Sequence, residues 1–345
     1  MSDVQQQLLD YLVSHPLSSS SDIYEGLQQS VSVATVKRLL VKLQSENYVV
    51  TEGKGKGTKY LISPGYSLFY PISIDKYFEK EIDERKINQN FNLQLVHEIL
   101  QGARLFTTEE ESHLNKLQQQ YTANIARLSS EAYAKELERL AIDLSWKSSQ
   151  IEGNTYTLLE TERLLKEKQT AEGKPKDDAT MLLNHKEAIS FIIKNPNYVI
   201  PLTVSRIEDI HSLLIKDLGV DRNIRQRRVG ISGTNYRPLD NEYQIREALQ
   251  AMCDLINKKE NVFEKALLAL VLLSYIQPFN DGNKRTARIV SNALLIAHHY
   301  CPVSFRTVDS IIYKKAMLIF YEQNNIQAFK QIFISQFEFA VNTYF

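Results

Sequence analysis

The run from Ala266 to Ile276 constrains the fold more than any other stretch of this 345-residue chain. Its eleven residues are apolar except for Ser274. A membrane-spanning helix needs about 20 such residues, so the run predicts a buried helix of a globular protein, and no membrane partner is expected. The chain also holds only 12 glycines and 9 prolines, and helical spacing of apolar side chains dominates it. We therefore expect a mainly α-helical protein.

Composition places the chain among ordinary globular proteins. Hydrophobic residues make up 43 % of it and charged residues 24 %, which excludes disordered and fibrous classes. Forty-one basic residues balance 41 acidic ones, so no overall charge indicates nucleic acid. Two cysteines, Cys253 and Cys301, cannot form the disulfide framework of a secreted domain, and the first residues lack the features of a signal peptide. These observations predict a cytoplasmic protein.

Residues 1–63 have the pattern of a small separate domain. Helical spacing predicts helices over Val4–Leu12, Ile23–Leu27 and Val33–Ser45. Two strand-like runs follow, Tyr48–Thr51 and Lys59–Ile62, around the turn GKGKG. Three helices followed by a basic hairpin resemble a winged helix-turn-helix, a family in which the third helix enters the DNA major groove. Winged helices also serve as dimerisation or protein-binding modules, and that alternative stays open.

The charge of this domain is unevenly distributed. Residues 1–31 contain four acidic residues and no Lys or Arg, whereas residues 32–60 contain six basic and two acidic residues, a net charge of 6 − 2 = +4. The positive charge therefore falls on the third helix and the hairpin, as DNA binding requires. The candidate DNA-binding residues are Lys37, Arg38, Lys42, Lys54 and Lys56.

The rest of the chain separates into three zones. Residues 64–90 are aromatic and then charged, and we expect a connector there. Residues 91–197 have helical spacing, interrupted by the turn-like GKPKDD at 173–178. Residues 198–345 are also expected to be helical, except for a strand-like segment near Val229–Tyr236.

The stretch QPFNDGNKRTAR at 277–288 concentrates the groups that bind nucleotide phosphates. It lies between two predicted apolar helices, so it forms a loop that leads into a helix N-terminus, where unpaired backbone N–H groups and the helix dipole attract anions. Asp281 supplies a hard oxygen ligand for Mg²⁺. Asn283 is a hydrogen-bond donor, and Lys284, Arg285 and Arg288 are cationic donors. A polar helix start that caps neighbouring carbonyls is the alternative.

This stretch resembles the signature of the Fic family, H-P-F-x-D-G-N-[G/K]-R-x-x-R, at every position except the first. The resemblance extends over roughly residues 66–340 and implies an all-helical domain that transfers AMP from ATP to a hydroxyl side chain of a target protein. It implies that Asp281 holds Mg²⁺ or Mn²⁺. It further implies that Gly282, Asn283 and Lys284 form the phosphate-binding turn and that Arg285 and Arg288 bind the outer phosphates. Phe279 is implied to be a core anchor, and His211 to pack rather than catalyse.

Two further segments resemble elements of the same family. Ser148–Asn154 fits the inhibitory-helix pattern [S/T]-x-x-x-E-[G/N]. The resemblance implies that Ser148, Glu152 and Gly153 form the inhibitory motif and that Glu152 pairs with Arg288 against the γ-phosphate. Residues 229–238 resemble the β-hairpin flap that docks a target segment by strand addition. The flap residues are Val229, Gly230, Ile231, Ser232 and Gly233. A simple helix end and an ordinary surface hairpin are the respective alternatives.

Gln277 stands where the family has its general-base histidine. An amide does not titrate near neutral pH and cannot take a proton, so we expect nucleotide binding with weak or absent transfer. The Lys284–Arg285 pair also resembles the Doc branch, which transfers the γ-phosphate. Three functions therefore stay open: an adenylyltransferase restrained by Glu152 that modifies a target or itself, an ATP-sensing DNA-binding regulator with a degenerate domain, and a Doc-like phosphotransferase. On resemblance alone, a homodimer is expected.

Overall fold

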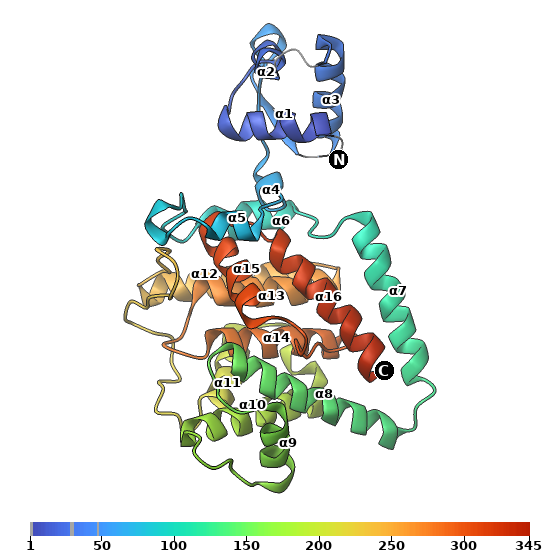
Figure 1. Ribbon diagram of the computed structural model, residues 1–345, viewed down its shortest axis with the longest axis vertical. Helices are drawn as coiled ribbons and strands as arrows, with labels where there is room; N and C mark the ends of the chain where they lie inside the picture. The colour runs from blue at the N-terminus through green and yellow to red at the C-terminus, as the bar shows by residue number, and fades with distance from the viewer. Residues whose placement is uncertain (1–2, 28–30, 47) are drawn as a thin grey trace. The chain divides into compact units, whose positions relative to one another are not determined.

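The computed structural model describes residues 3–27, 31–46 and 48–345, without the side chain of Lys56. The chain forms two compact units, Met1–Pro71 and Ile72–Phe345 (Figure 1). The expected mainly α-helical fold is confirmed, since helices dominate both units and the described residues hold one regular sheet of two strands. Among these same residues, no helix combines the length and apolarity needed to cross a membrane.

The first unit consists of three helices, a short hairpin and a fourth, one-turn helix. Its elements are α1 (Asp3–Ser14), α2 (Ser20–Gly26), α3 (Val33–Ser45), β1 (Val49–Glu52), the 3-10 turn η1 (Gly55–Gly57), β2 (Lys59–Ile62) and α4 (Pro64–Ser67). β1 and β2 pair antiparallel, with Val49 opposite Ile62 and Glu52 opposite Lys59. Ser18 adds an antiparallel bridge to Tyr60. Leucines from α1 and α3 share one core with Tyr66 of α4, so the unit extends past residue 63.

The second unit is helical. It contains α5 (Ile74–Phe78), the 3-10 turn η2 (Ile82–Glu84), the π-helix η3 (Leu95–Ile99), α6 (Leu100–Gly102), α7 (Thr108–Ile125), α8 (Ser130–Ile151), α9 (Leu158–Glu167), α10 (Lys176–Lys194), the 3-10 turn η4 (Pro196–Val199), α11 (Val204–Leu214), α12 (Glu242–Lys258), α13 (Val262–Ile276), α14 (Asn283–Ala297), α15 (Ser310–Gln323) and α16 (Gln327–Tyr344).

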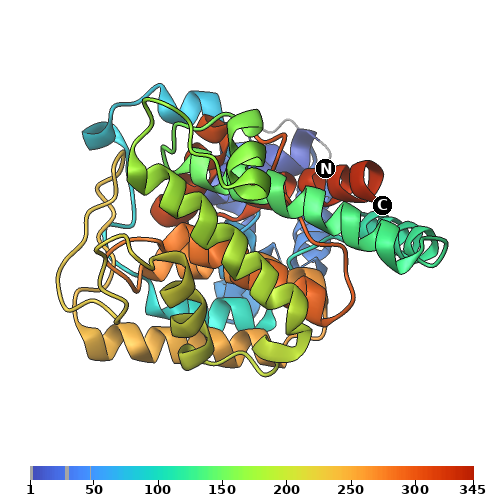
Figure 2. The same ribbon diagram turned by 90° about the horizontal axis from the view of Figure 1, so that it is seen from below.

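Helix α13 is the centre of this unit. It contains the apolar run Ala266–Ile276, and all its residues are buried. A helix that is apolar on every side must be covered by other elements, and α12, α14 and α15 pack against it (Figure 1). α8 packs on α10 and also contacts α14, α15 and α16; Figure 2 shows α8 and α10 side by side. α14 therefore lies between the central helix and α8.

Two segments differ from the sequence-based expectation in detail. Residues 72–90, expected to be part of a connector, pack into the second unit, because Tyr77 and Arg85 contact Glu322 of α15. The expected flap, residues 229–238, runs as an irregular loop around a Ser232–Gly233 turn; its one described bridge joins Arg237 to Asn90 in parallel. The loop has two glycines and no partner strand, so a regular ladder does not form.

Because α12, α14 and α15 pack against α13, shortening one of its central side chains will destabilise the second unit. We expect Leu270→Ala to lower the free energy of unfolding by about 3 kcal/mol, since Leu270 is fully buried. The matched control Leu159→Ala, at a position that is 76 % exposed, will change it by less than about 0.5 kcal/mol. Urea unfolding followed by the fluorescence of Trp146, the single tryptophan, measures both. Equal effects would contradict the central role of α13.

Candidate functional site

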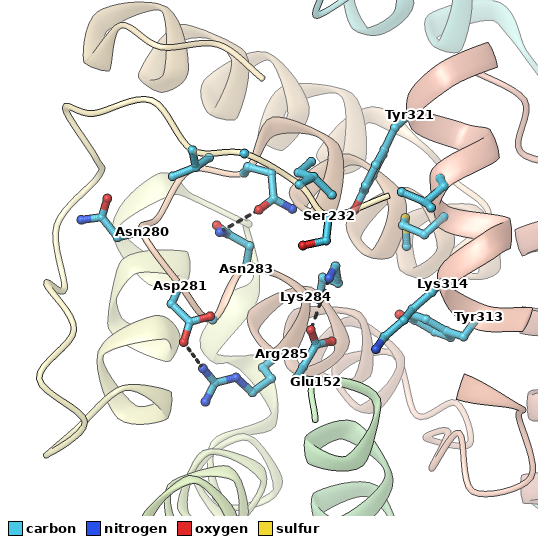
Figure 3. A pocket seen from close by; sticks show the side chains of 17 residues that line it. Glu152, Ser232, Asn280, Asp281, Asn283, Lys284, Arg285, Tyr313, Lys314 and Tyr321 are labelled. Atoms are coloured by element: carbon cyan, nitrogen blue, oxygen red, sulfur yellow. Dashed lines mark hydrogen bonds and ion pairs between the residues drawn. The ribbon is translucent and has the colours of Figure 1, made fainter. Parts of the chain in front are cut away.

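The loop between α13 and α14 borders a cavity of about 340 Å³ (Figure 3). This volume suits a small organic ligand. The lining residues come from the end of α8, the 229–232 loop, the α13–α14 loop and α15. They are Glu152, Val229, Gly230, Ile231, Ser232, Gln277, Asn280, Asp281, Gly282, Asn283, Lys284, Arg285, Tyr313, Lys314, Met317, Leu318 and Tyr321. The structure thus brings together the three segments that the sequence singled out in this part of the chain.

The N-terminus of α14 faces this cavity without a capping side chain. Gly282 occupies the N-cap position with a left-handed backbone (φ +81°) and no side-chain cap. The first N–H groups of a helix have no partner within the helix, and the helix dipole adds positive potential there. This end of α14 is therefore able to bind an anion.

The backbone angle and the tight space both favour glycine at position 282. A Cβ atom at this position would approach Ile215 Cγ2 to 3.2 Å and His211 Cδ2 to 3.3 Å. His211 stacks on Phe279 with ring centroids 3.6 Å apart, and its Nε2 lies 3.0 Å from the carbonyl oxygen of Asp281. Burial lowers the pKa of His211 to about 4, so the imidazole that packs against the loop is neutral.

Gln277 uses its side chain to hold the loop. It ends α13 in a left-handed conformation (φ 51°) and is buried. Its Nε2 donates to the carbonyl oxygen of Ser274 at 2.6 Å, and its Oε1 accepts from Asn283 Nδ2 at 3.0 Å. Asn283 in turn bonds both backbone groups of Phe279 at 2.8 Å. Gln277, at the position of the expected base, therefore joins the two ends of the loop through the hydrogen bonds of its amide.

Three cationic side chains extend from the first turns of α14. Lys284 is partly buried, whereas Arg285 and Arg288 are fully buried. Nε and Nη1 of Arg285 and Nη1 of Arg288 have no hydrogen-bond partner among the described residues. Lys284 and Arg285 line the cavity, so their positive charge favours an anionic ligand there.

Glu152 of α8 neutralises part of this positive charge. Its Oε1 lies 2.7 Å from Arg288 Nη2 and its Oε2 lies 3.3 Å from Lys284 Nζ. α8 ends at Ile151, Glu152 is its C-cap, and Gly153 has a left-handed backbone (φ +103°) that directs the chain away. Burial raises the pKa of the Glu152 carboxyl, but the charges of Arg288 and Lys284 outweigh it and lower the pKa to about 2. Glu152 is thus ionised at neutral pH.

Arg288 makes two further bonds to α8, both to Ser148. Its Nε donates to Ser148 Oγ at 2.7 Å and its Nη2 to the Ser148 carbonyl oxygen at 2.9 Å. Ser148 Oγ also lies 2.7 Å from His185 Nε2. Burial and then the charges of Arg288 and Arg285 lower the pKa of His185 well below its usual range, so this histidine is neutral. Ser148 and Glu152 together hold the guanidinium of Arg288, a residue of α14, against α8.

Asp281 is the residue that could contact a metal ion. Its carboxylate is 63 % exposed and lies 2.9 Å from Arg285 Nη2. Within the described part of the chain, no group of three or more His, Cys, Asp or Glu residues is placed to hold a metal. A Mg²⁺ ion here would need phosphate oxygens as further ligands, which is a common arrangement for Mg²⁺.

The wall opposite α14 is more apolar. Tyr313, Met317 and Tyr321 follow one another at four-residue spacing along one face of α15 and line the cavity (Figure 3). The hydroxyls of Tyr313 and Tyr321 are buried and have no hydrogen-bond partner in the described structure. Val229, Gly230, Ile231 and Ser232 of the expected flap close a third side. A flat, partly polar ring system fits this wall.

The candidate DNA-binding residues belong to the first unit, whereas the residues that line this cavity belong to the second. Lys37, Arg38 and Lys42 are exposed on α3, and Lys42 Nζ lies 3.6 Å from Glu46 Oε1. Lys54 is exposed between β1 and β2, while the side chain of Lys56 lies outside the described residues. α3 thus presents a basic face, together with the exposed apolar side chains Val33 and Val41.

Sequence reasoning missed several residues that build the site. Arg225 is buried and donates through Nε to the Gln277 carbonyl oxygen at 2.6 Å and through Nη2 to that of Leu239. It joins the flap loop to the motif, yet in the sequence RNIRQRR nothing separates it from its exposed neighbours. Tyr313 and Tyr321 resemble ordinary core positions of an amphipathic helix. No local sequence pattern indicated a role for His185, because its hydrogen-bond partner Ser148 lies 37 positions away.

The lowered pKa of Glu152 implies a stability that depends on pH. A carboxyl with a depressed pKa stabilises the fold above its unfolded value, near 4.5, and loses that contribution as pH falls toward 2. We expect Glu152→Gln to lower the free energy of unfolding by about 3 kcal/mol, constant from pH 5 to 8. The difference from the unsubstituted protein will shrink below about pH 4. Urea unfolding across this pH range measures it; a difference that grows toward acid pH would contradict the ion pair.

Comparison with known proteins agrees with this geometry. A model of the Fic/DOC family matches residues 201–295. "Protein adenylyltransferase Fic" of Nematostella vectensis is 29 % identical over 171 residues, which is 48 % of this chain and 39 % of that protein. The protein of the same name from Drosophila grimshawi is 25 % identical over 212 residues, 60 % of this chain and 42 % of that protein. The matches thus span about two fifths of the length of these curated relatives.

Solved structures show the same fold. Fic-1 from C. elegans superimposes with a TM-score of 0.59 at 20 % identity, covering 68 % of this chain and 72 % of that one. A Fic domain-containing signaling protein from Bacteroides thetaiotaomicron gives a TM-score of 0.57 at 20 % identity, covering 67 % of this chain and 94 % of that one. The matched residues 201–295 include the α13–α14 loop and α14 up to residue 295. Residues 201–295 therefore match the Fic/DOC family in sequence, and the second unit has the fold of these Fic structures.

Proposed function

We propose that the second unit is a protein adenylyltransferase that binds ATP with a divalent cation and transfers AMP to a protein hydroxyl. Glu152 restrains it and the amide at Gln277 slows it. The observation that carries this proposal is the pairing of two unlike walls around one cavity. Lys284, Arg285 and an uncapped helix start form one wall, and the Tyr313–Met317–Tyr321 face forms the other.

A nucleoside triphosphate has groups that complement both walls of the cavity. Its phosphates find N–H donors at the start of α14 and cations at Lys284, Arg285 and Arg288. Its base fits between Met317 of α15 and Ile231 of the flap loop, both of which line the cavity. Asp281 would hold Mg²⁺ together with phosphate oxygens, and the cation would offset phosphate charge when bound.

Glu152 competes with the outer phosphates for the same cations. Its two oxygens contact Arg288 and Lys284, the side chains proposed to bind those phosphates. Since Ser148 also holds Arg288 in place, removing the Glu152 carboxylate leaves a positioned guanidinium without its counter-charge. A phosphate group can then take the place of the carboxylate.

Transfer requires a proton acceptor that Gln277 does not supply. The hydroxyl oxygen of the target attacks the α-phosphorus, the bond to the β-phosphate oxygen breaks, pyrophosphate leaves, and the hydroxyl proton must be accepted. The Gln277 amide does not titrate and is already bonded at both ends. Losing a general base commonly costs a factor of about 10² to 10⁴ in rate, while phosphate binding uses other residues.

We therefore expect rapid self-modification only when both restraints are changed. The full chain with Glu152→Gly and Gln277→His, incubated with ATP and Mg²⁺, will gain the mass of AMP, whereas Glu152→Gly alone will react about 10² to 10⁴ times more slowly. Intact-mass spectrometry identifies the group added, so a phosphate adduct would instead indicate Doc-like γ-phosphate transfer. Equal rates in the two variants would contradict the role assigned to Gln277.

The matched control is Glu152→Gly with Gln277→Asn, which changes the same two positions but restores no base. ATP binding is measured for each variant by calorimetry. Absence of an adduct in every variant, with ATP still bound, would remove the transferase proposal and favour an ATP-binding regulator.

A DNA-binding regulator is the second candidate function, and the basic exposed face of α3 favours it. Lys37, Arg38 and Lys42 are exposed there, and the order of helices and hairpin in the first unit suits major-groove docking. The two functions are compatible, because an enzyme can also bind DNA through a separate unit.

Binding of the full chain to DNA will weaken as salt rises, because counterions are released from the phosphates that Lys and Arg contact. Arg38→Glu will reduce the affinity, whereas Lys86→Glu, an equal charge change in the other unit, will leave it unchanged. A fluorescence-anisotropy titration with duplex DNA at several salt concentrations measures both. No binding at low salt, or equal loss in the two variants, would eliminate a specific role for α3.

A further inference from the structure

We propose that Lys314 of α15 is a further phosphate-binding residue, which holds the terminal phosphate of the nucleotide and thereby selects a nucleoside triphosphate over a diphosphate. This inference rests on the proposed function, because it names a residue and a preference of the same site. Lys314 belongs neither to the α13–α14 loop nor to α14, and no sequence pattern indicated a role for it. It lines the cavity from α15.

The position of Lys314 on α15 brings its side chain to the cavity. Lys314 and Leu318 are four residues apart and form a row beside the Tyr313–Met317–Tyr321 face, and both rows line the cavity. Among the described residues of α15, Lys314 is the single charged side chain that lines it. In Figure 3 this side chain extends from α15 into the cavity. A cation is therefore placed on the wall that is otherwise the more apolar one.

The amine of Lys314 is available to an anion. The side chain is exposed and makes no ion pair or hydrogen bond with any described residue. Lys284 and Arg288, in contrast, are both paired with Glu152, at 3.3 Å and 2.7 Å. In Figure 3 the Lys314 amine is directed toward the same Glu152 carboxylate. A lysine is a point charge with three donors on a flexible stem, so Lys314 can follow a ligand that replaces the carboxylate.

The charge around the cavity favours an anion with more than one negative charge. Three basic and two acidic residues line it, a net charge of 3 − 2 = +1. They are Glu152, Asp281, Lys284, Arg285 and Lys314. Arg288, which pairs with Glu152, adds one more positive charge. A terminal phosphate carries more negative charge than a carboxylate, so it balances these cations better than Glu152 does.

The cations around Glu152 also match the shape of a terminal phosphate. Such a phosphate has three free oxygens, and Lys284, Arg288 and Lys314 approach the place of the Glu152 carboxylate from two different helices. The inner phosphates would remain at the start of α14. A triphosphate chain that begins there extends one phosphate farther than a diphosphate. The contact with Lys314 would therefore be made by the triphosphate and be absent for the diphosphate.

The test compares ATP and ADP by calorimetry, with Mg²⁺ present, on the full chain carrying Glu152→Gly, which removes the competing carboxylate. Adding Lys314→Ala will weaken ATP binding about 10-fold and ADP binding less than about 2-fold. Adding Lys314→Arg, which keeps the charge, will retain the preference for ATP. Lys315→Ala is the matched control and will change neither affinity, because Lys315 lies over the Phe78 ring at 5.4 Å and does not line the cavity.

Equal losses for ATP and ADP, or equal effects of Lys314→Ala and Lys315→Ala, would overturn the proposal. Circular dichroism shows that each variant is folded. Inorganic tripolyphosphate is the second probe, because it has the phosphate chain without the base. Tripolyphosphate binding that depends on Lys314, in a chain that does not bind ATP, would remove the proposed function and support the phosphate contact. ATP binding that is indifferent to Lys314 would remove only the role of this residue.

Discussion

The architecture of the site depends on one buried guanidinium. Arg288 lies on α14 with its side chain fully excluded from solvent, a position that is costly unless the charge is paired and hydrogen-bonded. α8 meets this requirement with the Ser148 hydroxyl, the Ser148 carbonyl and the Glu152 carboxylate. The helix that closes the cavity and the helix that builds it are therefore joined by the same contact. The contact that pairs the buried charge of Arg288 is therefore also the contact that restricts access to the cavity.

The same constraint explains which parts of the site were predictable from the sequence. The apolar run Ala266–Ile276 and the polar loop that follows it determine a buried helix, a turn and an uncapped helix start through local chemistry alone. The grouping of Lys284, Arg285 and Arg288 follows from helical spacing. The Glu152–Arg288 contact spans 136 positions, and it could be expected only by resemblance, since no local pattern in Ser148–Asn154 indicates a partner.

Other features were beyond sequence reasoning for physical reasons. The segment 229–238 has strand-like spacing, but a strand needs a partner to pair with, and its neighbours along the chain provide none. Its shape comes instead from Arg85, Asp83 and Gln89, about 150 positions earlier. Arg225 and Arg227 lie in the same local sequence, yet Arg225 is buried against the motif and Arg227 is exposed. Burial of a single charge is decided by tertiary packing, which no local pattern contains.

Gln277 separates two tasks that share one loop. Holding the loop requires a hydrogen-bonding side chain at the end of α13, and the amide bonds Ser274 and Asn283 in this role. Accepting a proton requires a group that titrates near neutral pH, which the amide does not do. The groups proposed to bind phosphate are positioned by α14, Ser148 and the loop, so they do not depend on a titratable group at 277. In the proposed function, nucleotide recognition is therefore physically independent of proton transfer, because different side chains carry the two tasks.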